Sequence, residues 1–343
     1  MPVTAKGADM TKPAGNMTDL ARLAGVSVST VSRALSGNAL VNADTRDRIV
    51  TLAREQGFQP NLVARNLRLR RTEAIGVILP LGHQADQHLT DPFFLTLIGY
   101  LADALATRGY DMLLRKVVPD DEFWLDRIVT SGRVDGVILI GQSNEAAAID
   151  RVARTFAPLV VWGARLPEQH YVSVGTDNFD GGAMATRHLV DCGRQRLLFL
   201  GDSIAPEIAQ RQAGFDQVCA EAGLSNTAHV VQVGLVADAA YRELIVAIEG
   251  EPEVDGIVAA SDVIAIAAIR ALATLGRSVP DDVAVVGFDD VPIAQHVVPP
   301  LTTIAQDLRL GADLLVTKLL ALLAGEAATS EQMPPVLVRR RSA

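Results

Sequence analysis

From residue 74 onward, short apolar runs alternate regularly with longer amphipathic stretches. This alternation is typical of strands followed by helices, and it produces parallel sheets with helices on both faces. About ten strands would be wide for one open sheet, so we expect two lobes, each with its own parallel open sheet. The clearest strands are expected at 75–80, 111–117, 134–140, 159–162, 196–200, 229–233, 254–260 and 283–288, and the clearest helices at 91–108, 178–192, 207–222 and 262–275.

Composition supports an α/β body and argues against other classes of protein. Hydrophobic residues make up 49% of the chain and aromatic residues only 4%, so the core is mainly aliphatic, which favours close packing of helices on sheets. The two cysteines, Cys192 and Cys219, lack metal-binding or redox spacing, and we expect them to be reduced core thiols. No stretch is apolar and charge-poor for long enough to span a membrane.

Charge is distributed unevenly along the chain. Residues 1–72 contain 11 Lys and Arg against five Asp and Glu, a net charge of +6, whereas the remainder carries −15 and the whole chain −9. A basic head on an acidic body is expected if only the head contacts phosphates. Residues 1–16 are polar and contain no apolar run, so we expect a disordered tail rather than a signal peptide.

The basic segment contains three short amphipathic stretches, which we expect to be helices at 17–24, 28–35 and about 42–56. Thr18 is expected to cap the first helix and Ser27 the second. Gly25 suits a left-handed turn between these helices, and Val26 can fill the small core between them. Residues 17–60 therefore have the pattern of a helix-turn-helix.

A helix-turn-helix places the start of its second helix against base edges in the major groove. Val28 and Ser29 occupy that start, where a valine methyl can contact a thymine methyl and a hydroxyl can donate or accept. Arg33, one turn later, can reach a guanine or a phosphate. Short polar side chains suited to phosphate contacts follow the same surface, namely Thr18, Thr30, Ser32 and Asn42.

Three segments of the head match one family in order and spacing. They are 24–33 (AGVSVSTVSR), 45–46 (TR) and 57–61 (GFQPN). On these segments the head closely resembles the DNA-binding region of the LacI/GalR repressor family.

The resemblance also implies a role for residues 61–73. In the family this stretch forms a hinge helix when the dimer is on its operator, and a leucine from each hinge helix opens the central base step from the minor groove. Leu67 matches that leucine and Ala64 the small residue beside it, and an apolar wedge of this kind kinks the duplex. Asn61 begins the stretch, and Arg68 can bind a phosphate or line the groove. The alternative is that Leu67 is an ordinary apolar linker residue.

Polar and aromatic residues follow the expected strands of both lobes. Ligands of open α/β sheets bind beyond the carboxyl ends of the strands. Carboxylates, an arginine, an amide and aromatic rings together suit a polyhydroxylated ligand. The candidates at this edge are Asp91, Phe93, Phe94, Gln142 and Trp162 in the first lobe and Arg211, Asp262 and Asp289 in the second.

The body resembles the same family along almost its whole length, in segments 134–138, 176–178, 211–215, 260–262, 285–290 and 299–307. The resemblance implies effector contacts by Arg211 and Asp289, and Phe93 and Phe94 look like an aromatic pair that flanks the ligand in several members. Alternatives remain open: Asp262 and Asp289 as caps of loops or helices, Arg211 in a surface ion pair, and Phe94 in the core.

These features predict an all-α helix-turn-helix head followed by an α/β, periplasmic-binding-protein-like body of two lobes with parallel open sheets. The expected boundaries are 1–16 for the tail, 17–60 for the DNA-binding domain, 61–73 for the hinge helix and linker, and 74–343 for the body. Within the body we expect the first lobe at about 74–174 and 305–330 and the second at about 175–304 and 331–343.

The resemblance implies a cytoplasmic, sequence-specific transcription regulator, a repressor of carbohydrate uptake or catabolism genes. A pseudo-palindromic operator in double-stranded DNA needs two heads, so we expect a homodimer, and the chain shows no carboxy-terminal heptad repeat for a tetramer. The expected effector is a sugar or sugar derivative, with a purine or nucleoside as the alternative, acting as inducer or co-repressor. No cofactor is expected, and no metal, because His83 and His88 have no further ligands.

Two other classes of protein share this type of body. An enzyme is not expected, because the chain has no P-loop, Gly-x-Gly-x-x-Gly or Gly-x-Ser-x-Gly motif. Asp289 and Asp290 are adjacent on one loop and cannot act as acid and base on opposite sides of a substrate. A solute-binding transport protein would carry an export signal and would have no use for a DNA-reading head.

Overall fold

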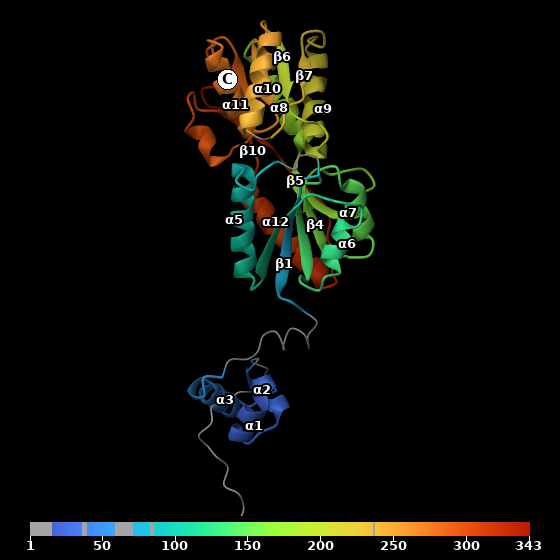
Figure 1. The fold of residues 1–343 in the computed structure, drawn as a ribbon, viewed down its shortest axis with the longest axis vertical. Coiled ribbons are helices and arrows are strands. Elements are labelled where there is room, and N and C mark those ends of the chain that lie inside the picture. Colours follow the sequence, from blue (N-terminus) through green and yellow to red (C-terminus); the bar gives the residue numbers. More distant parts are fainter. Residues whose placement is uncertain (1–15, 36–39, 59–70, 83–85, 236) are drawn as a thin grey trace, which may run out of the picture. The chain divides into compact units, whose positions relative to one another are not determined.

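The computed structural model describes residues 16–35, 40–58, 71–82, 86–235 and 237–343. The chain forms two compact units, residues 1–71 and residues 72–343 (Figure 1). The break falls within two residues of the expected end of the linker. No helix in the described parts of the chain is both long and apolar enough to cross a lipid bilayer.

The first unit is built from three helices, α1 (Met17–Ala24), α2 (Val28–Leu35) and α3 (Ala43–Glu55), as the sequence predicts. Gly25 has φ 64°, the left-handed conformation expected at the end of α1. Arg48 of α3 donates to the carbonyl oxygen of Ala24 at 3.1 Å, which joins α3 to the same turn. The helices enclose one small core, made by Leu20, Ala21, Ala24, Val31, Ala34, Val41, Ile49 and Ala53.

One helix cap differs from the prediction. Asn16, and not Thr18, caps α1, because the helix begins at Met17 and the Asn16 side chain accepts from the Asp19 N–H at 3.0 Å. The prediction for α2 is confirmed, since the Ser27 hydroxyl accepts from the Thr30 N–H at 3.2 Å.

The first lobe of the second unit has an all-parallel sheet with strand order β11-β5-β4-β3-β1-β2. Alternate residues of its strands face opposite sides: Val137 and Leu139 join one core cluster, whereas Ile138 and Ile140 join another. The strands are β1 (Ala74–Pro80), β2 (Asp111–Val117), β3 (Gly136–Ile140), β4 (Leu159–Trp162), β5 (Val172–Thr176) and β11 (Glu331–Met333). The helices α5 (Pro92–Thr107) and α12 (Leu308–Leu323) cover one face, and α6 (Trp124–Val129) and α7 (Ala146–Ala153) cover the other (Figure 1).

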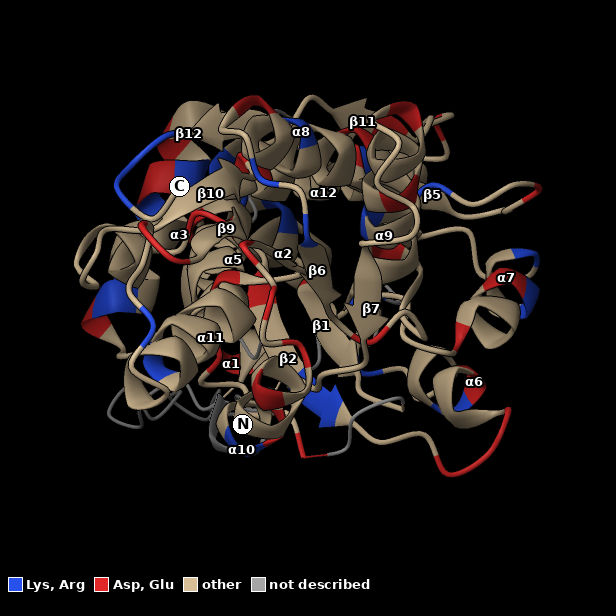
Figure 2. Cartoon of the chain, turned by 90° about the horizontal axis from the view of Figure 1, so that it is seen from above, with Lys and Arg blue, Asp and Glu red and all other residues tan. Residues whose placement is uncertain are grey.

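The second lobe repeats this plan, with strand order β12-β10-β9-β8-β6-β7. Its strands are β6 (Leu197–Leu200), β7 (His229–Val231), β8 (Gly256–Ala259), β9 (Ala284–Asp289), β10 (Thr302–Ala305) and β12 (Val336–Val338). Its helices are α8 (Asn178–Asp191), α9 (Pro206–Glu221), α10 (Ala237–Gly250) and α11 (Asp262–Thr274), with a short 3-10 helix at Pro292–Gln295. Only β12 is antiparallel, at the edge of this sheet. The interior strands β1 and β6 contain no charged residue, whereas the edge strand β2 contains Asp111, Arg115 and Lys116, and many helices and loops are charged as well (Figure 2).

The chain crosses between the lobes after β5, after β10 and between β11 and β12. The predicted lobe boundaries at 174 and 330 are therefore wrong by a few residues. β5 continues to Thr176 in the first sheet, and β11 pairs with β5, where Met333 is buried in the first-lobe core. Cys219 is buried as expected, but Cys192 is exposed, because it lies at the end of α8.

Candidate functional site

The exposed start of α2 carries the side chains predicted to read DNA. Val28 is 42% exposed, although it is apolar, and Ser29 and Arg33 are exposed as well. The Ser27 hydroxyl lies 2.8 Å from the hydroxyls of both Ser29 and Thr30, so the first turn of the helix presents a cluster of hydroxyls. An exposed valine beside hydroxyls, on a helix whose other face is buried, is the arrangement needed for contacts in a major groove.

The remaining predicted DNA contacts divide into two groups. Thr18 and Asn42 are exposed and Ser32 is half-buried; Asn42 also caps α3, accepting from the Asp44 N–H at 2.9 Å. The predicted hinge contacts lie outside the described residues, and these are Asn61, Ala64, Leu67 and Arg68.

A cavity lies between the two lobes at the carboxyl ends of their strands. From the first lobe it is lined by the ends of β1, β3 and β4 and the start of α5, and from the second by the start of α9, Ser261 and the end of β9. This is the edge that the strand–helix alternation predicts for a ligand. Six of the eight predicted effector residues line it: Asp91, Phe93, Phe94, Trp162, Arg211 and Asp289.

Aromatic rings form the wall of the cavity on the first-lobe side. The Phe93 ring centroid lies 5.7 Å from that of Phe94 and 6.3 Å from that of Trp162. Phe93 also packs against the core clusters of both lobes, so it lies where they meet. Phe94 is 7% exposed and belongs to the first-lobe core as well as to the lining. The wall offers apolar faces on which a ring can stack.

Arg211 is held in place on the second-lobe side by close contact of α8 with α9. A Cβ on Gly182 would lie 2.0 Å from the Arg211 carbonyl oxygen, so only glycine allows the helices to approach this closely. The Arg211 guanidinium then lies 3.6 Å from the Phe288 ring centroid and donates from Nε to Asn178 Oδ1 at 2.8 Å. It also donates to the Ala260 carbonyl oxygen and lies 4.0 Å from Asp289 Oδ1. Arg211 is thus a buried, preorganised cation and not a surface ion-pair residue.

Asp289 lies at a strained turn that another aspartate stabilises. Asp289 has φ 117° and Asp290 has φ 55°, both unusual for residues other than glycine. Asp262 accepts from the Val291 N–H at 2.9 Å and from the Thr303 hydroxyl at 2.5 Å, which fixes the chain just after the turn. The Asp289 carboxylate accepts from Gln306 Nε2 at 2.7 Å, in the segment where the chain crosses between the lobes. Asp289 therefore connects the cavity to the crossover.

Two predicted residues do not line the cavity. Gln142 is fully buried: its side-chain amide donates to Tyr171 Oη and the Ala164 carbonyl oxygen and accepts from the Ala164 N–H, so no hydrogen-bonding group is left for a ligand. Asp262 is also fully buried, and its carboxylate is occupied in stabilising the 289–291 turn. The alternative of a loop-stabilising role is therefore the better description of Asp262.

Glu207 was not among the predicted residues, although it lines the cavity from the first turn of α9. Its carboxylate accepts from the Gln142 N–H at 3.2 Å, and Gln210 of the same helix donates to the Arg165 carbonyl oxygen at 3.1 Å. Both bonds join the second lobe to the first. The signal in the sequence is the place of Glu207 in the segment 202–211, which follows the predicted strand 196–200, where ligands of such sheets bind.

Burial makes negative charge costly in this cavity. It raises the pKa of Asp91 and Glu207, and it raises the pKa of Asp289 to about 7 even though Arg211 opposes the change. Among the lining residues that the structure describes, Arg211 is the only cation, and it interacts with the carboxylates of Glu207 and Asp289.

Asp289→Asn is expected to alter how stability depends on pH. Because the pKa of Asp289 rises from 3.8 to about 7 on folding, its contribution to stability is full below about pH 4 and is lost as pH rises through 7. The Tm of the variant minus the Tm of the wild type should therefore become more positive between about pH 5 and pH 8. In a domain of this size a change of ~1 kcal/mol in the free energy of unfolding shifts the Tm by about 2–4 °C. Differential scanning calorimetry at several pH values measures it; a Tm difference that stays constant or falls contradicts this role of Asp289.

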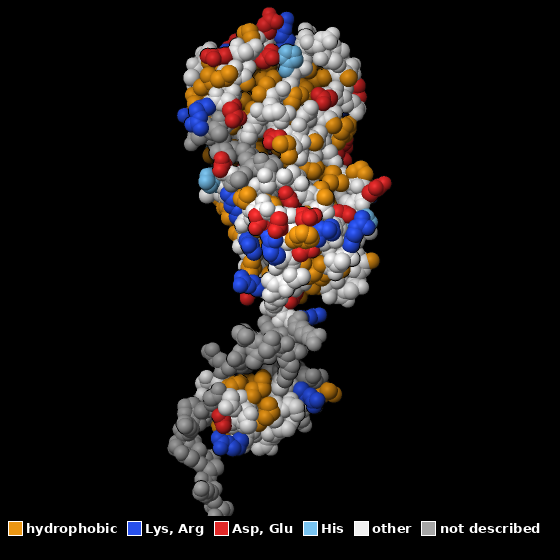
Figure 3. Space-filling model, turned by 45° about the vertical axis from the view of Figure 1, so that its right-hand side comes forward, with side chains coloured by type: hydrophobic (Ala, Val, Ile, Leu, Met, Phe, Trp, Pro, Cys, Tyr) orange, Lys and Arg blue, Asp and Glu red, His pale blue; other side chains and the backbone are white. Residues whose placement is uncertain are grey.

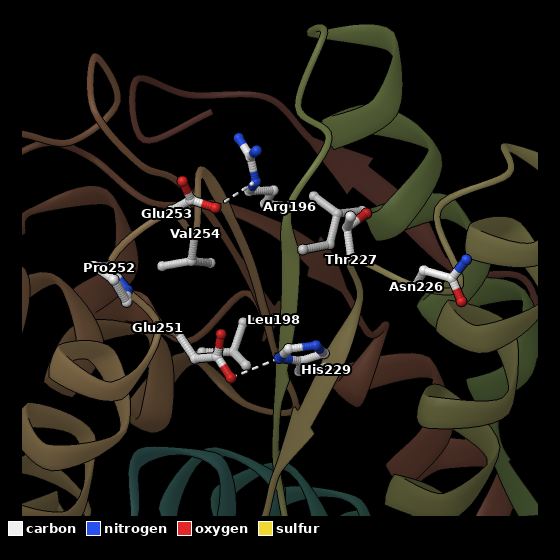
Figure 4. Close-up of a pocket in the computed structure, with 10 residues that line it drawn as sticks. Arg196, Leu198, Asn226, Thr227, His229, Glu251, Pro252, Glu253 and Val254 are labelled. Carbon is white, nitrogen blue, oxygen red and sulfur yellow. Dashed lines mark hydrogen bonds and ion pairs between the residues drawn. The ribbon is translucent and has the colours of Figure 1, made fainter.

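A second hollow lies at the opposite, amino-terminal ends of β6 and β7 (Figure 4). There His229 Nδ1 lies 2.5 Å from Glu251 Oε1, and Arg196 Nε lies 3.3 Å from Glu253 Oε2. These four side chains are between 36% and 73% exposed, so both pairs lie at the solvent surface. The hollow has no buried polar group directed toward a ligand, and we assign it no role.

The surface of the body does not resemble a nucleic-acid interface in the view of Figure 3. Acidic and basic side chains are interspersed over the first lobe on that face. A phosphate backbone requires a concentration of positive charge, so this face is unsuited to DNA.

Comparison with known proteins agrees with both halves of this description. Residues 16–61 match the family described as bacterial regulatory proteins, lacI family, and residues 186–343 match the periplasmic binding protein-like domain. The chain is 32% identical over 299 residues to the transcriptional regulator CelR of Thermobifida fusca, across 84% of this chain and 85% of that protein. It is 29% identical to the transcriptional repressor PurR of Haemophilus influenzae (strain PittEE), across 85% and 87% of the two chains.

Solved structures show the same architecture. A CelR–cellobiose complex superposes with a TM-score of 0.70 at 27% identity, covering 96% of this chain and all of that one. The lac repressor dimer bound to operator and the anti-inducer ONPF superposes with a TM-score of 0.83 at 25% identity, covering 96% and 99% of the two chains.

A helix-turn-helix unit followed by a two-lobed, periplasmic-binding-protein-like body defines a DNA-binding transcription regulator. The chain belongs to the LacI family of bacterial transcriptional regulators. The relatives described above are regulators and not enzymes, which agrees with the absence of catalytic motifs in the sequence.

Proposed function

We propose that this protein represses genes of carbohydrate uptake or catabolism, and that a sugar-like effector in the cavity between the lobes controls its affinity for operator DNA. The observation that carries the proposal is the cavity lining, which combines the Phe93 and Trp162 rings with Arg211 and the carboxylates of Asp91 and Asp289. Aromatic faces cover sugar rings, and carboxylates and guanidinium groups bind their hydroxyls. The CelR–cellobiose complex is a relative with a sugar bound.

We propose that two arrangements of the lobes supply the two states that regulation requires. Contacts across the cavity, such as Glu207 to the Gln142 N–H, depend on how closely the lobes approach. An effector that binds one lobe arrangement better than another shifts the population toward it. An inducer would favour the arrangement with low operator affinity, and a co-repressor the one with high affinity.

The DNA half of the proposal requires two copies of the chain. One helix-turn-helix reads a half-site, so a pseudo-palindromic operator in double-stranded DNA is bound by a homodimer. We propose that the regulator works as such a dimer in the cytoplasm. We also propose a minor-groove contact for the hinge, with Leu67 as the wedge on the basis of the family resemblance.

A two-stage experiment tests the proposal. A thermal-shift screen of monosaccharides, disaccharides, purines and nucleosides identifies molecules that raise the Tm of the full chain. Each hit is then added to a gel shift with operator DNA selected from a random pool. A sugar that changes operator affinity supports the proposal, whereas a purine as the sole regulating hit, or the absence of DNA binding at low salt, overturns it.

Exchange of Val28 and Ser29 for other small residues is expected to change the preferred operator sequence. These two side chains stand at the exposed start of α2, and a contact to one base edge contributes ~1–3 kcal/mol of discrimination. Selection from a random pool with the Val28→Ala and Ser29→Ala variants measures the effect. Recovery of the wild-type consensus from both variants would show that other residues read the bases.

A further inference from the structure

Carboxylates outnumber cations among the described residues that line the cavity. Three carboxylates face it, from Asp91, Glu207 and Asp289. A fourth acceptor is the amide of Gln87, whose residue is 3% exposed and whose Oε1 has no hydrogen-bond partner among the described residues. The same amide donates one of its two N–H groups from Nε2 to Asp91 Oδ2 at 3.2 Å, while its oxygen has no partner among the described residues.

The one guanidinium among the described lining residues is already engaged in part by the protein, which uses two of its five N–H groups. Arg211 donates to Asn178 Oδ1 and to the Ala260 carbonyl oxygen, and its face is covered by the Phe288 ring. It is also the nearest cation to Asp289, at 4.0 Å. A ligand that brought a negative charge would have to compete with Asp289 for the same guanidinium.

An extra negative charge would therefore meet three carboxyl groups and one guanidinium among the described lining residues, in a buried site that disfavours negative charge. Like charges placed together at an interface cost several kcal/mol and serve to reject the wrong partner. A hydroxyl-rich molecule, in contrast, supplies the donors that the free acceptors lack.

From this imbalance we infer that the cavity selects a hydroxyl-rich effector without negative charge and rejects phosphorylated sugars and sugar acids. This inference rests on the proposed function, since it names the chemical class of the effector of the same site. It separates the free sugar from the phosphorylated or oxidised forms that metabolism makes from it, so the regulator would respond to a sugar before its phosphorylation.

Matched ligand series test the inference. Glucose, galactose, ribose and cellobiose are compared by isothermal titration calorimetry with glucose 6-phosphate, galacturonate, ribose 5-phosphate and cellobionate, using the full chain at constant ionic strength. The charged counterpart of any neutral sugar that binds is expected to bind at least about 100-fold more weakly. A charged member that binds as tightly as its neutral partner overturns the inference while leaving a sugar-responsive regulator in place.

Inorganic phosphate provides a test of the inference that does not depend on the identity of the effector. Phosphate at ten millimolar is expected to leave the Tm unchanged relative to chloride of equal ionic strength. A rise in Tm that Arg211→Lys removes would show an anion site in the cavity and overturn the inference. Failure of every sugar and of phosphate to bind would count against the proposed sugar effector but would agree with the rejection of anions.

Charge-neutral variants distinguish electrostatic rejection from poor fit. For each pair of ligands we compare the affinity for the charged ligand with the affinity for its neutral counterpart. In Glu207→Gln and Asp289→Asn the ratio of the first to the second is expected to rise at least about tenfold, because a like charge is removed while the shape of the cavity is kept. The control is Glu221→Gln on the same helix, whose exposed carboxylate pairs with Arg187 at 3.1 Å outside the cavity. An unchanged ratio in both cavity variants would show that shape, and not charge, excludes the anions, and would overturn the inference.

Discussion

Arg211→Ala is expected to abolish the response of operator binding to the effector and to destabilise the body. Arg211 is only 8% exposed. Its guanidinium stacks on the Phe288 ring and donates to Asn178 Oδ1 and to the Ala260 carbonyl oxygen. Its removal leaves Asp289 and Glu207 buried without a counter-charge, and such a change costs about 3–5 kcal/mol. The free energy of unfolding of residues 72–343 should fall by that order, and effector affinity should fall at least about 100-fold.

Arg211→Lys separates charge from geometry. Lysine keeps the positive charge, but it cannot bond to Asn178 and Ala260 at once while stacking flat on Phe288. Its stability should therefore lie between those of wild type and Arg211→Ala, and its effector affinity should still be strongly reduced. Calorimetric unfolding and effector titration of operator gel shifts measure the two effects.

The control for both variants is Arg187→Ala on α8. Arg187 pairs with Glu221 at 3.1 Å, but both side chains are about half exposed, and exposed pairs contribute ~0–1 kcal/mol. Arg187→Ala should behave like wild type in both measurements. If operator binding by Arg211→Ala responds to the effector as the wild type does, Arg211 does not belong to the effector site.

The sequence predicts the elements of the body well wherever an apolar run is long. The prediction for 111–117 coincides with β2 and that for 159–162 with β4. Four strands were not predicted, namely β5, β10, β11 and β12. The last two have only three residues each, and Glu331 and Gln332 are polar. Their assignment to different sheets depends on Met333 fitting into the first-lobe core, a tertiary contact that no periodicity encodes.

For the cavity, position along the chain was easier to predict than side-chain direction. The rule that ligands bind beyond the carboxyl ends of the strands correctly placed Arg211 and Asp289 in the cavity lining. Strand order alone brings both residues to this edge of the sheet. The same rule failed for Gln142 and Asp262, whose side chains turn inward to Tyr171 and to the Val291 N–H. Which of two neighbouring polar residues meets the ligand is decided by hydrogen-bond partners distant in sequence, as the 289–291 turn illustrates.

Leu20→Ala is expected to eliminate operator binding while leaving effector binding intact. Leu20 is fully buried in the core of the first unit, where eight buried residues form the core among those that the structure describes. Truncation of a buried leucine costs about 2–5 kcal/mol, and small domains bury too little surface to have much stability in reserve. The loss is therefore comparable to the whole stability of this unit, and the α2 surface that carries Val28 and Ser29 would no longer be held in place.

The body should not share this loss, because residues 72–343 form a compact unit with separate cores. Calorimetry of the full chain should show the body transition unchanged, and isothermal titration should give wild-type effector affinity. Thr51→Ala is the control, since Thr51 is exposed on α3 and exposed substitutions change stability by about 0.5 kcal/mol or less. Wild-type operator affinity in Leu20→Ala would contradict this prediction. It would mean that the three-helix unit tolerates a cavity in its core and still recognises DNA.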